Sequence, residues 1–148
     1  MTPLQAWLDE ATSALVEETV RMLIKRHANI LLAAILFGSV ARHEERPLDD
    51  ACPSDVDLLA IFDTTDRLVK PYREAIFSTS IDACALHLDA PREVNVMLSD
   101  RTMRTWDSMF LDNLAREGIL LYARGSLPAP LATRQSLQER LEDRGVTL

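Results

Sequence analysis

Two acidic residues spaced two apart, Asp55 and Asp57, are the strongest chemical signal in this chain. Side chains at positions i and i+2 of a β-strand point to the same face of the sheet. Acidic residues are poor strand formers and like charges on one face repel, so such a pair generally needs a cation between its carboxylates. Mg²⁺ prefers oxygen ligands, commonly one or two carboxylates together with substrate phosphates. We therefore predict a metal site at Asp55 and Asp57.

A second signal, Gly38-Ser39, follows the apolar run at residues 30–37. A strand, a tight turn and a helix N-terminus together make a place where backbone N–H groups can meet a phosphate. Ser39 adds a hydroxyl and Arg42 adds a charged donor. Alone, a Gly-Ser pair after a strand is a common turn, but beside Asp55 and Asp57 it indicates a nucleotide site in which Gly38, Ser39 and Arg42 hold the phosphates.

Hydrophobic periodicity predicts the elements that position these residues. The predicted helices cover residues 3–28 with Thr2 as N-cap, 67–78, 103–117 with Ser99 or Asp100 as cap and Gly118 as terminator, and 131–144 after a hinge at 127–130. The predicted strands cover residues 30–37, 56–62, 93–98 and 119–122, and the polar segment at 43–53 is predicted to be an exposed loop. The strand at 93–98 is expected to bury Val94, Val96 and Leu98 and to place Glu93 and Asn95 on one face.

Composition bounds the class of protein. The chain has 148 residues, 47% of them hydrophobic and 26% charged, as in an ordinary globular protein, so we expect a single domain. The net charge of −7 argues against an extended nucleic-acid surface. The longest apolar run is too short to span a membrane, and we expect no secretory signal and a cytoplasmic location. Two distant cysteines, Cys52 and Cys84, are expected to stay unpaired.

The remaining candidates have simpler structural interpretations. The three histidines, His27, His43 and His87, lack ligand spacing and are expected to be exposed or at an edge. Trp106 and Phe110 are spaced i and i+4, so they are expected to pack together on one helix face.

The two motifs together resemble a known family. Residues 38–42 (Gly-Ser-Val-Ala-Arg) and 54–58 (Ser-Asp-Val-Asp-Leu) are similar to the signature of DNA polymerase β-like nucleotidyltransferases, in particular the minimal nucleotidyltransferases. The resemblance covers about residues 31–122 and includes the ending at 116–122. It implies an α/β (α+β) fold with a small mixed sheet flanked by helices, the core being about residues 31–122 of one domain. It also implies ATP as substrate and two Mg²⁺ ions bound by Asp55 and Asp57.

The chain departs from the family pattern at two places. His43 replaces a glycine, and the loop that follows is longer than the compact form. Asn95 stands where active members place a third carboxylate, and an amide cannot act as a general base. Asn95 is therefore the altered catalytic position, and whether Glu93 replaces the missing carboxylate stays open.

Three functional hypotheses follow from the resemblance. The leading one is a Mg²⁺-dependent nucleotidyltransferase that transfers AMP from ATP to a hydroxyl of a protein partner (AMPylation), as the antitoxin of an HEPN-type RNase toxin. The second is a catalytically impaired protein of the same fold that neutralises or regulates its partner by binding alone. The third, transfer to a small molecule, needs a substrate pocket from an added domain or from a dimer, and formation of a homo-oligomer stays open.

Overall fold

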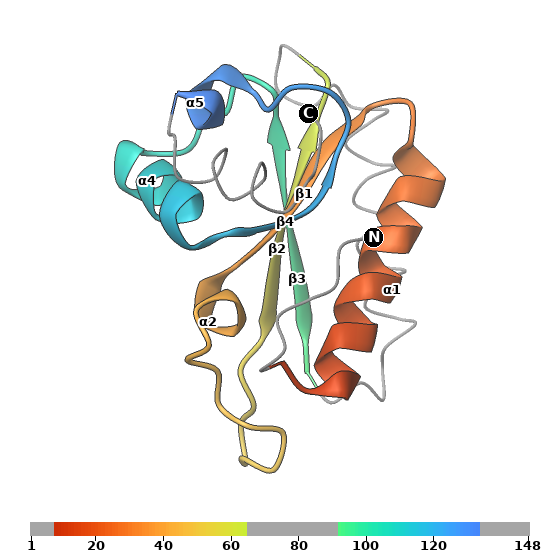
Figure 1. Cartoon of the computed structure of the whole chain (residues 1–148), viewed down its shortest axis with the longest axis vertical. Helices are drawn as coiled ribbons and strands as arrows, with labels where there is room; N and C mark the ends of the chain where they lie inside the picture. Colours follow the sequence, from red (N-terminus) through yellow and green to blue (C-terminus); the bar gives the residue numbers. More distant parts are fainter. Residues whose placement is uncertain (1–7, 65–91, 134–148) are drawn as a thin grey trace.

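A mixed four-stranded sheet forms the centre of the computed structural model, which describes residues 8–64 and 92–133 (Figure 1). The strands are β1 (Leu31–Phe37), β2 (Val56–Phe62), β3 (Val94–Asp100) and β4 (Ile119–Ala123), in the spatial order β3-β2-β1-β4. Strand β1 runs antiparallel to β2 and β4, whereas β2 and β3 are parallel. The predicted α+β class with a small mixed sheet and flanking helices is confirmed.

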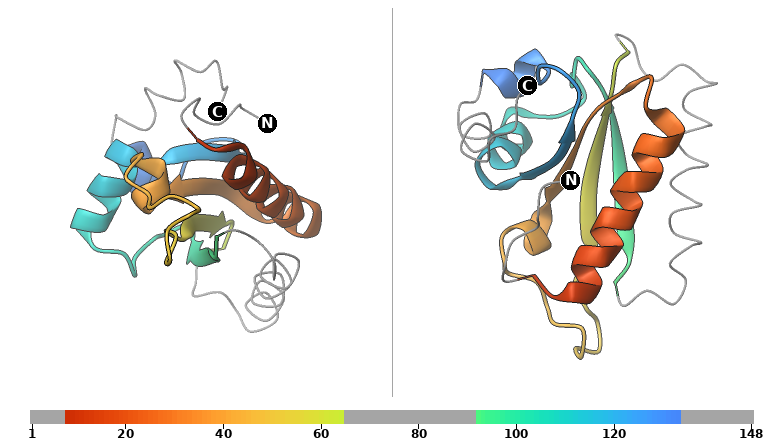
Figure 2. Two further views of the ribbon diagram at one scale, coloured as in Figure 1. Left: turned by 90° about the horizontal axis from the view of Figure 1, so that it is seen from below. Right: turned by 45° about the vertical axis from the view of Figure 1, so that its right-hand side comes forward.

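Helices cover both faces of the sheet, as Figure 2 shows. On one face Leu36 and Leu58 pack with α1 (Glu10–His27). On the other face Ile35 and Leu59 pack with α4 (Ser108–Glu117) and α5 (Ala129–Ala132). Burial on both faces explains why β1 and β2 are almost continuously apolar instead of alternating. Because side chains alternate along a strand, Asp57 of β2 lies on the same face as Leu59, the face that α4 covers.

Helix α1 begins later than predicted, since residues 8 and 9 are not helical. The side chain of Asp9 accepts a hydrogen bond from the Thr12 backbone N–H at 2.8 Å and caps the helix at Glu10. The Thr12 hydroxyl also donates a hydrogen bond to the Asp9 carboxylate, at 2.8 Å. Aspartate is among the best N-caps, so this local arrangement fixes the start of the helix. The predicted end near His27 is confirmed.

Helix α4 also begins later than predicted, at Ser108 instead of Met103. The Asp100 side chain accepts the backbone N–H groups of Thr102 and Met103, at 2.8 and 3.0 Å, and so forms a turn. Met103 then takes a positive φ of 51°, which a continuing right-handed helix does not allow. Asp107 caps the helix by accepting from the Phe110 N–H, and Gly118 ends it as predicted.

Two predictions about burial are wrong in part. Val94 is buried as expected, but Val96 and Leu98 are half-buried, because β3 lies at the edge of the sheet among the described strands. His27, expected to be exposed or at an edge, is buried, with its ring edge-to-face against Phe62 at 5.7 Å. Trp106 and Phe110 do stack, at 4.8 Å, although Trp106 precedes α4 instead of lying on it.

The other strand predictions hold closely. Strands β1, β2 and β4 match the predicted ranges within one residue, and Cys52 is a free, exposed thiol in the exposed loop. The predicted hinge at 127–130 instead holds the start of α5, anchored by buried Leu127 and Leu131. Several predictions lie outside the described residues: the Thr2 cap, the helix at 67–78, Cys84, His87 and the C-terminal helix beyond residue 133. Within the described part of the chain, no helix has the length and apolar character needed to cross a membrane.

Candidate functional site

Three side chains lie in a row across the sheet at the end of β1. Phe37 pairs with Asp57 on β2, and Asp57 pairs with Asn95 on β3. Residues directly opposite one another on neighbouring strands project to the same face. Asp55 precedes β2 and adds a second carboxylate beside Asp57. The structure thus brings together Asp55, Asp57 and Asn95, the three residues predicted to be catalytic.

The Asn95 amide joins the two carboxylates. Its Nδ2 group donates to Asp55 Oδ2 at 3.2 Å and to Asp57 Oδ1 at 3.3 Å. An amide NH₂ carries two hydrogens, so one is available for each carboxylate. The amide is neutral, however, and it leaves the negative charges of the two aspartates without a formal counter-charge from Asn95.

The environment raises the pKa of Asp57 above its ordinary value of 3.8. Burial is the main cause, because it disfavours the charged form, and the charge of Asp55 adds to it. The hydrogen bond from Asn95 and the charge of Arg42 oppose this shift. Asp57 is therefore a carboxylate whose ionised form costs free energy in this setting, as is common at ligand sites.

Gly38 brings the turn after β1 directly against this carboxylate. Its φ is +78°, and a Cβ atom built at this position would lie 2.5 Å from Asp57 Oδ2. Both the backbone conformation and the lack of space therefore require glycine here. The short helix α2 (Gly38–Ala41) starts at this turn, with half-buried Ser39 as its second residue. The predicted strand, Gly-Ser turn and helix sequence is confirmed.

Arg42 follows α2 and points toward acidic neighbours. Its Nε donates to Glu44 Oε2 at 3.1 Å, and its Nη1 lies 3.7 Å from Glu117 Oε2. The side chain is 37% exposed, so water shares these contacts. Arg42 is close enough to Asp57 for its charge to lower the pKa of that carboxyl. A ligand at Gly38 would compete with the two glutamates for this guanidinium.

The carboxylate oxygens of Asp55 and Asp57 suit a cation in type, but Asn95 Nδ2 occupies the point between them that a cation would take. One electropositive atom already reaches both carboxylates, so their oxygens converge on a common point. Glu93 is exposed, and the described residues contain no group of three or more His, Cys, Asp or Glu side chains able to hold a metal ion. The structure therefore does not join Glu93 to the aspartate pair.

Sequence reasoning missed Arg92, which holds the backbone just before Asp55. Its side chain is 1% exposed. It donates to the carbonyls of Arg46 and Ser54, at 2.7 and 3.0 Å, and to Thr12 Oγ1 at 2.8 Å. Its Nη2 also lies 3.6 Å from Asp9 Oδ1. Arg92 thus ties the start of α1, the loop after α2 and the approach to Asp55 into one unit, and an arginine after a proline gave no signal of this role.

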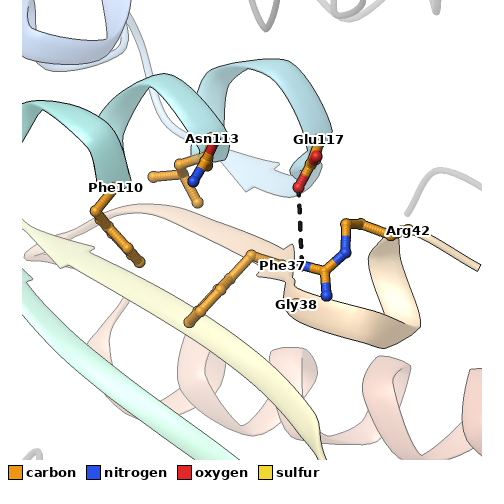
Figure 3. A pocket seen from close by; sticks show the side chains of 7 residues that line it. Phe37, Gly38, Arg42, Phe110, Asn113 and Glu117 are labelled. Atoms are coloured by element: carbon orange, nitrogen blue, oxygen red, sulfur yellow. Dashed lines mark ion pairs between the residues drawn. The ribbon is translucent and has the colours of Figure 1, made fainter. Parts of the chain in front are cut away.

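A pocket of about 220 Å³ lies beside Gly38 (Figure 3). The end of β1 contributes Phe37, and α4 contributes Phe110, Asn113 and Glu117. Figure 3 shows these side chains converging, with the ion pair between Glu117 and Arg42 beside them. The helix residues were not predicted as a site, although their spacing of three and four places them on one helix face.

Comparisons with known structures bear on the fold. The chain is similar to a mutant of the toxin-antitoxin MntA-HpeT, with a TM-score of 0.52, 14% identity, and coverage of 87% of this chain and 91% of that chain. It is also similar to a toxin-antitoxin crystallised with AMP-PNP, with a TM-score of 0.51, 17% identity, and coverage of 87% and 92%. No protein-family model and no curated protein sequence matches. At these identities the similarity establishes that the chain shares the fold of these toxin-antitoxin structures, in agreement with the α+β fold that the motifs led us to expect.

Proposed function

We propose that this protein is an antitoxin that binds ATP with Mg²⁺ and transfers AMP to a hydroxyl of its protein partner, an HEPN-type toxin. The observation that carries the proposal is the convergence of Asp55 and Asp57 on one point, directly against the Gly38 turn. Carboxylates and phosphates are the ligands that Mg²⁺ combines in phosphoryl-transfer sites. In this proposal the aspartate pair binds the Mg²⁺ ion and the Gly38 turn binds the phosphates of the same nucleotide.

Each residue has a proposed role. Asp55 and Asp57 hold Mg²⁺, which when bound would neutralise charge on the phosphates. The backbone at Gly38 and Ser39, with the Ser39 hydroxyl, binds the phosphates, and Arg42 exchanges its contacts with glutamates for phosphate oxygens. The structural neighbour that contains AMP-PNP supports an adenine nucleotide as ligand. The two toxin-antitoxin neighbours support a toxin as partner.

A second candidate function rests on Asn95. In transfer, the acceptor oxygen bonds to the α-phosphorus while the bond to pyrophosphate breaks, and the hydroxyl proton must go to a base. Asn95 cannot accept that proton, and it stands beside Asp57 where a third carboxylate is expected. Its amide also occupies the space between the two aspartates. These facts favour a protein that retains nucleotide binding and controls its partner through contact, without transfer.

One experiment separates the two candidates. The purified protein is incubated with Mg²⁺, ATP and its proposed partner, an HEPN-type protein, and the intact mass of both chains is measured. A gain of AMP units on the partner, absent with Asp57→Asn, supports transfer. Unchanged masses together with Mg²⁺-dependent ATP binding support the binding-only function. If ATP does not bind in the presence of Mg²⁺, both are wrong.

A further inference from the structure

The pocket adjoins the aspartate site at Gly38. Gly38 lines the pocket and also meets Asp57, and Phe37 lies opposite Asp57 in the strand register. A ligand whose phosphates lie at the Gly38 turn therefore has this pocket within reach. The pocket's volume of about 220 Å³ is below the 300–1,000 Å³ of sites that enclose a drug-sized molecule. It suits one ring system of a nucleotide, not the whole molecule.

Aromatic rings form the apolar wall of the pocket. Phe37 and Phe110 contact each other edge-to-face at 5.5 Å, and Phe110 stacks on Trp106 at 4.8 Å. Phe110 therefore contacts two other rings, which restrict its orientation before any ligand binds. A preorganised ring costs little conformational entropy on binding, and every nucleobase has a flat face that packs on such a ring.

The polar edge of the pocket carries a donor and an acceptor side by side. Asn113 Oδ1 accepts a hydrogen bond from Arg116 Nη2 at 2.6 Å. Its Nδ2 group presents donors, and the oxygen has a second lone pair. Asparagine pairs with adenine in this way, donating to N7 and accepting from the N6 amino group. Guanine has an O6 acceptor in place of that amino group, so it would face the Asn113 oxygen unfavourably.

We propose that this pocket, formed by Phe37, Phe110 and Asn113, binds the adenine base of the nucleotide and selects it over guanine. The inference rests on the proposed nucleotide-binding function and adds the residues that determine base preference. The phosphates lie at the Gly38 turn, the base packs against Phe110, and Asn113 reads its polar edge.

The test compares three ligands that share the phosphate end. Dissociation constants for ATP, GTP and inorganic tripolyphosphate, each with Mg²⁺, are measured calorimetrically on the wild type and on Phe110→Ala, Asn113→Ala and Met109→Ala. Phe110→Ala is expected to weaken ATP about tenfold or more, as for loss of a base-stacking ring, with tripolyphosphate unchanged. Asn113 is exposed, so its variant should fold normally while losing the preference for ATP over GTP. Met109, 74% exposed on the same helix and outside the pocket, is the matched control.

The outcomes distinguish this inference from the proposed function. If the wild type binds ATP and Phe110→Ala binds it with the same affinity, the assignment of the base pocket is wrong, whereas the proposed function is unaffected. Equal weakening of ATP and tripolyphosphate in Phe110→Ala also overturns it, since the effect then does not depend on the base. Equal affinity of the wild type for ATP and GTP overturns the selection by Asn113. A wild type that binds neither ATP nor tripolyphosphate overturns both the pocket and the proposed function.

Discussion

The carboxylates at the two ends of β2 differ in the charge of their hydrogen-bond partners. At the far end Asp63 follows the strand, and its oxygens pair with Arg101 Nη1 at 2.9 Å and with Arg124 Nη2 at 3.6 Å. Arg124 is itself held by the carbonyls of Ala28 and Asn29. At the near end Asp55 and Asp57 share a single neutral amide. One end therefore matches one carboxylate with two guanidinium groups, whereas the other places two carboxylates around a neutral amide, with the charge of Arg42 nearby but not paired with them.

We interpret this difference as that between a structural ion pair and the proposed ligand site. Asp63 is already neutralised, so it needs nothing from outside the chain. The ionised form of Asp57 is disfavoured by burial, with a further contribution from Asp55, and a cation would relieve that cost. Carboxylates with a perturbed pKa cluster at functional sites, and the raised pKa of Asp57 therefore supports the proposed ligand site. The two ends can be tested against each other with the same chemical change, aspartate to asparagine.

The largest difference is expected in nucleotide binding. Asp57→Asn should reduce Mg²⁺-dependent ATP affinity, and any AMP transfer, by at least about 100-fold, because losing a direct ligand exceeds the 10–100-fold cost of losing an outer partner. Asp63→Asn, at the other end of β2, should leave both unchanged. Calorimetry with Mg²⁺ and ATP gives the affinities. Equal losses in the two variants would contradict the distinction between the ends.

A third carboxylate beside Asp55 and Asp57 should increase the difference between the two ends of β2. Asn95→Asp should raise AMP transfer about tenfold or more, since it supplies the missing base beside Asp57. Without Mg²⁺ the same variant should unfold more easily than the wild type, because three carboxylates then converge with the bridging amide removed. Transfer is measured by partner mass, and stability by urea denaturation with and without Mg²⁺. Unaltered transfer in a variant that binds Mg²⁺ more tightly would show that Asn95 is not the limiting residue.

Asp57 and Asp63 should also affect stability with opposite sign: ionised Asp57 should destabilise the native state, and ionised Asp63 should stabilise it. Because the pKa of Asp57 is raised on folding, the native state binds the proton more tightly than the unfolded chain does. Ionised Asp57 therefore lowers the free energy of unfolding at neutral pH, and this cost disappears as the pH falls through the raised pKa. Without Mg²⁺, Asp57→Asn should be more stable than the wild type at pH 7, by up to about 1 kcal/mol. The gain should shrink toward pH 4, as measured by urea denaturation at each pH.

The smallest effect belongs to the paired carboxylate. Asp63→Asn should lower the free energy of unfolding by about 0.5 kcal/mol, since its partners are half exposed and surface ion pairs contribute little. The loss should be smaller at 1 M NaCl, where exposed charges are screened. Urea denaturation at low and high salt measures both values. A stabilising Asp63→Asn would show that this end, too, carries an uncompensated charge.

The sequence was sufficient for the strands and for the polar residues between them. Strands β1 and β2 are buried on both faces, so their apolar runs have clear limits: the run of β1 ends at Gly38, and the run of β2 starts after Asp57. The starts of α1 and α4 were missed because several polar residues compete as caps. Asp9 and Asp107 cap these helices, whereas Asp100 closes a turn of its own. Tertiary packing decides which of these residues caps the helix, and a local sequence pattern carries no information on that packing.

The pocket shows a different limit of sequence analysis. Phe110, Asn113 and Glu117 share one face of α4, and their spacing shows this. What that face meets depends on the crossing of α4 over the end of β1, which brings Phe37 and Gly38 against it. The contacts of Arg92 are of the same kind, since they join residues up to 80 positions apart in the chain.

The contacts of Arg92 and Ser54 also close the loop at 46–54 at its base. The Arg46 N–H donates to Ser54 Oγ at 2.7 Å, and Arg92 donates to the carbonyls of both loop ends. With its ends fixed in this way, the intervening segment can change length cheaply, since doubling a loop costs only about 0.6 kcal/mol in closure entropy. Evolution is thus free to insert or delete residues at 47–53 without displacing the aspartates. In homologous chains we expect length variation to concentrate there, while the arginine and serine that close the base persist.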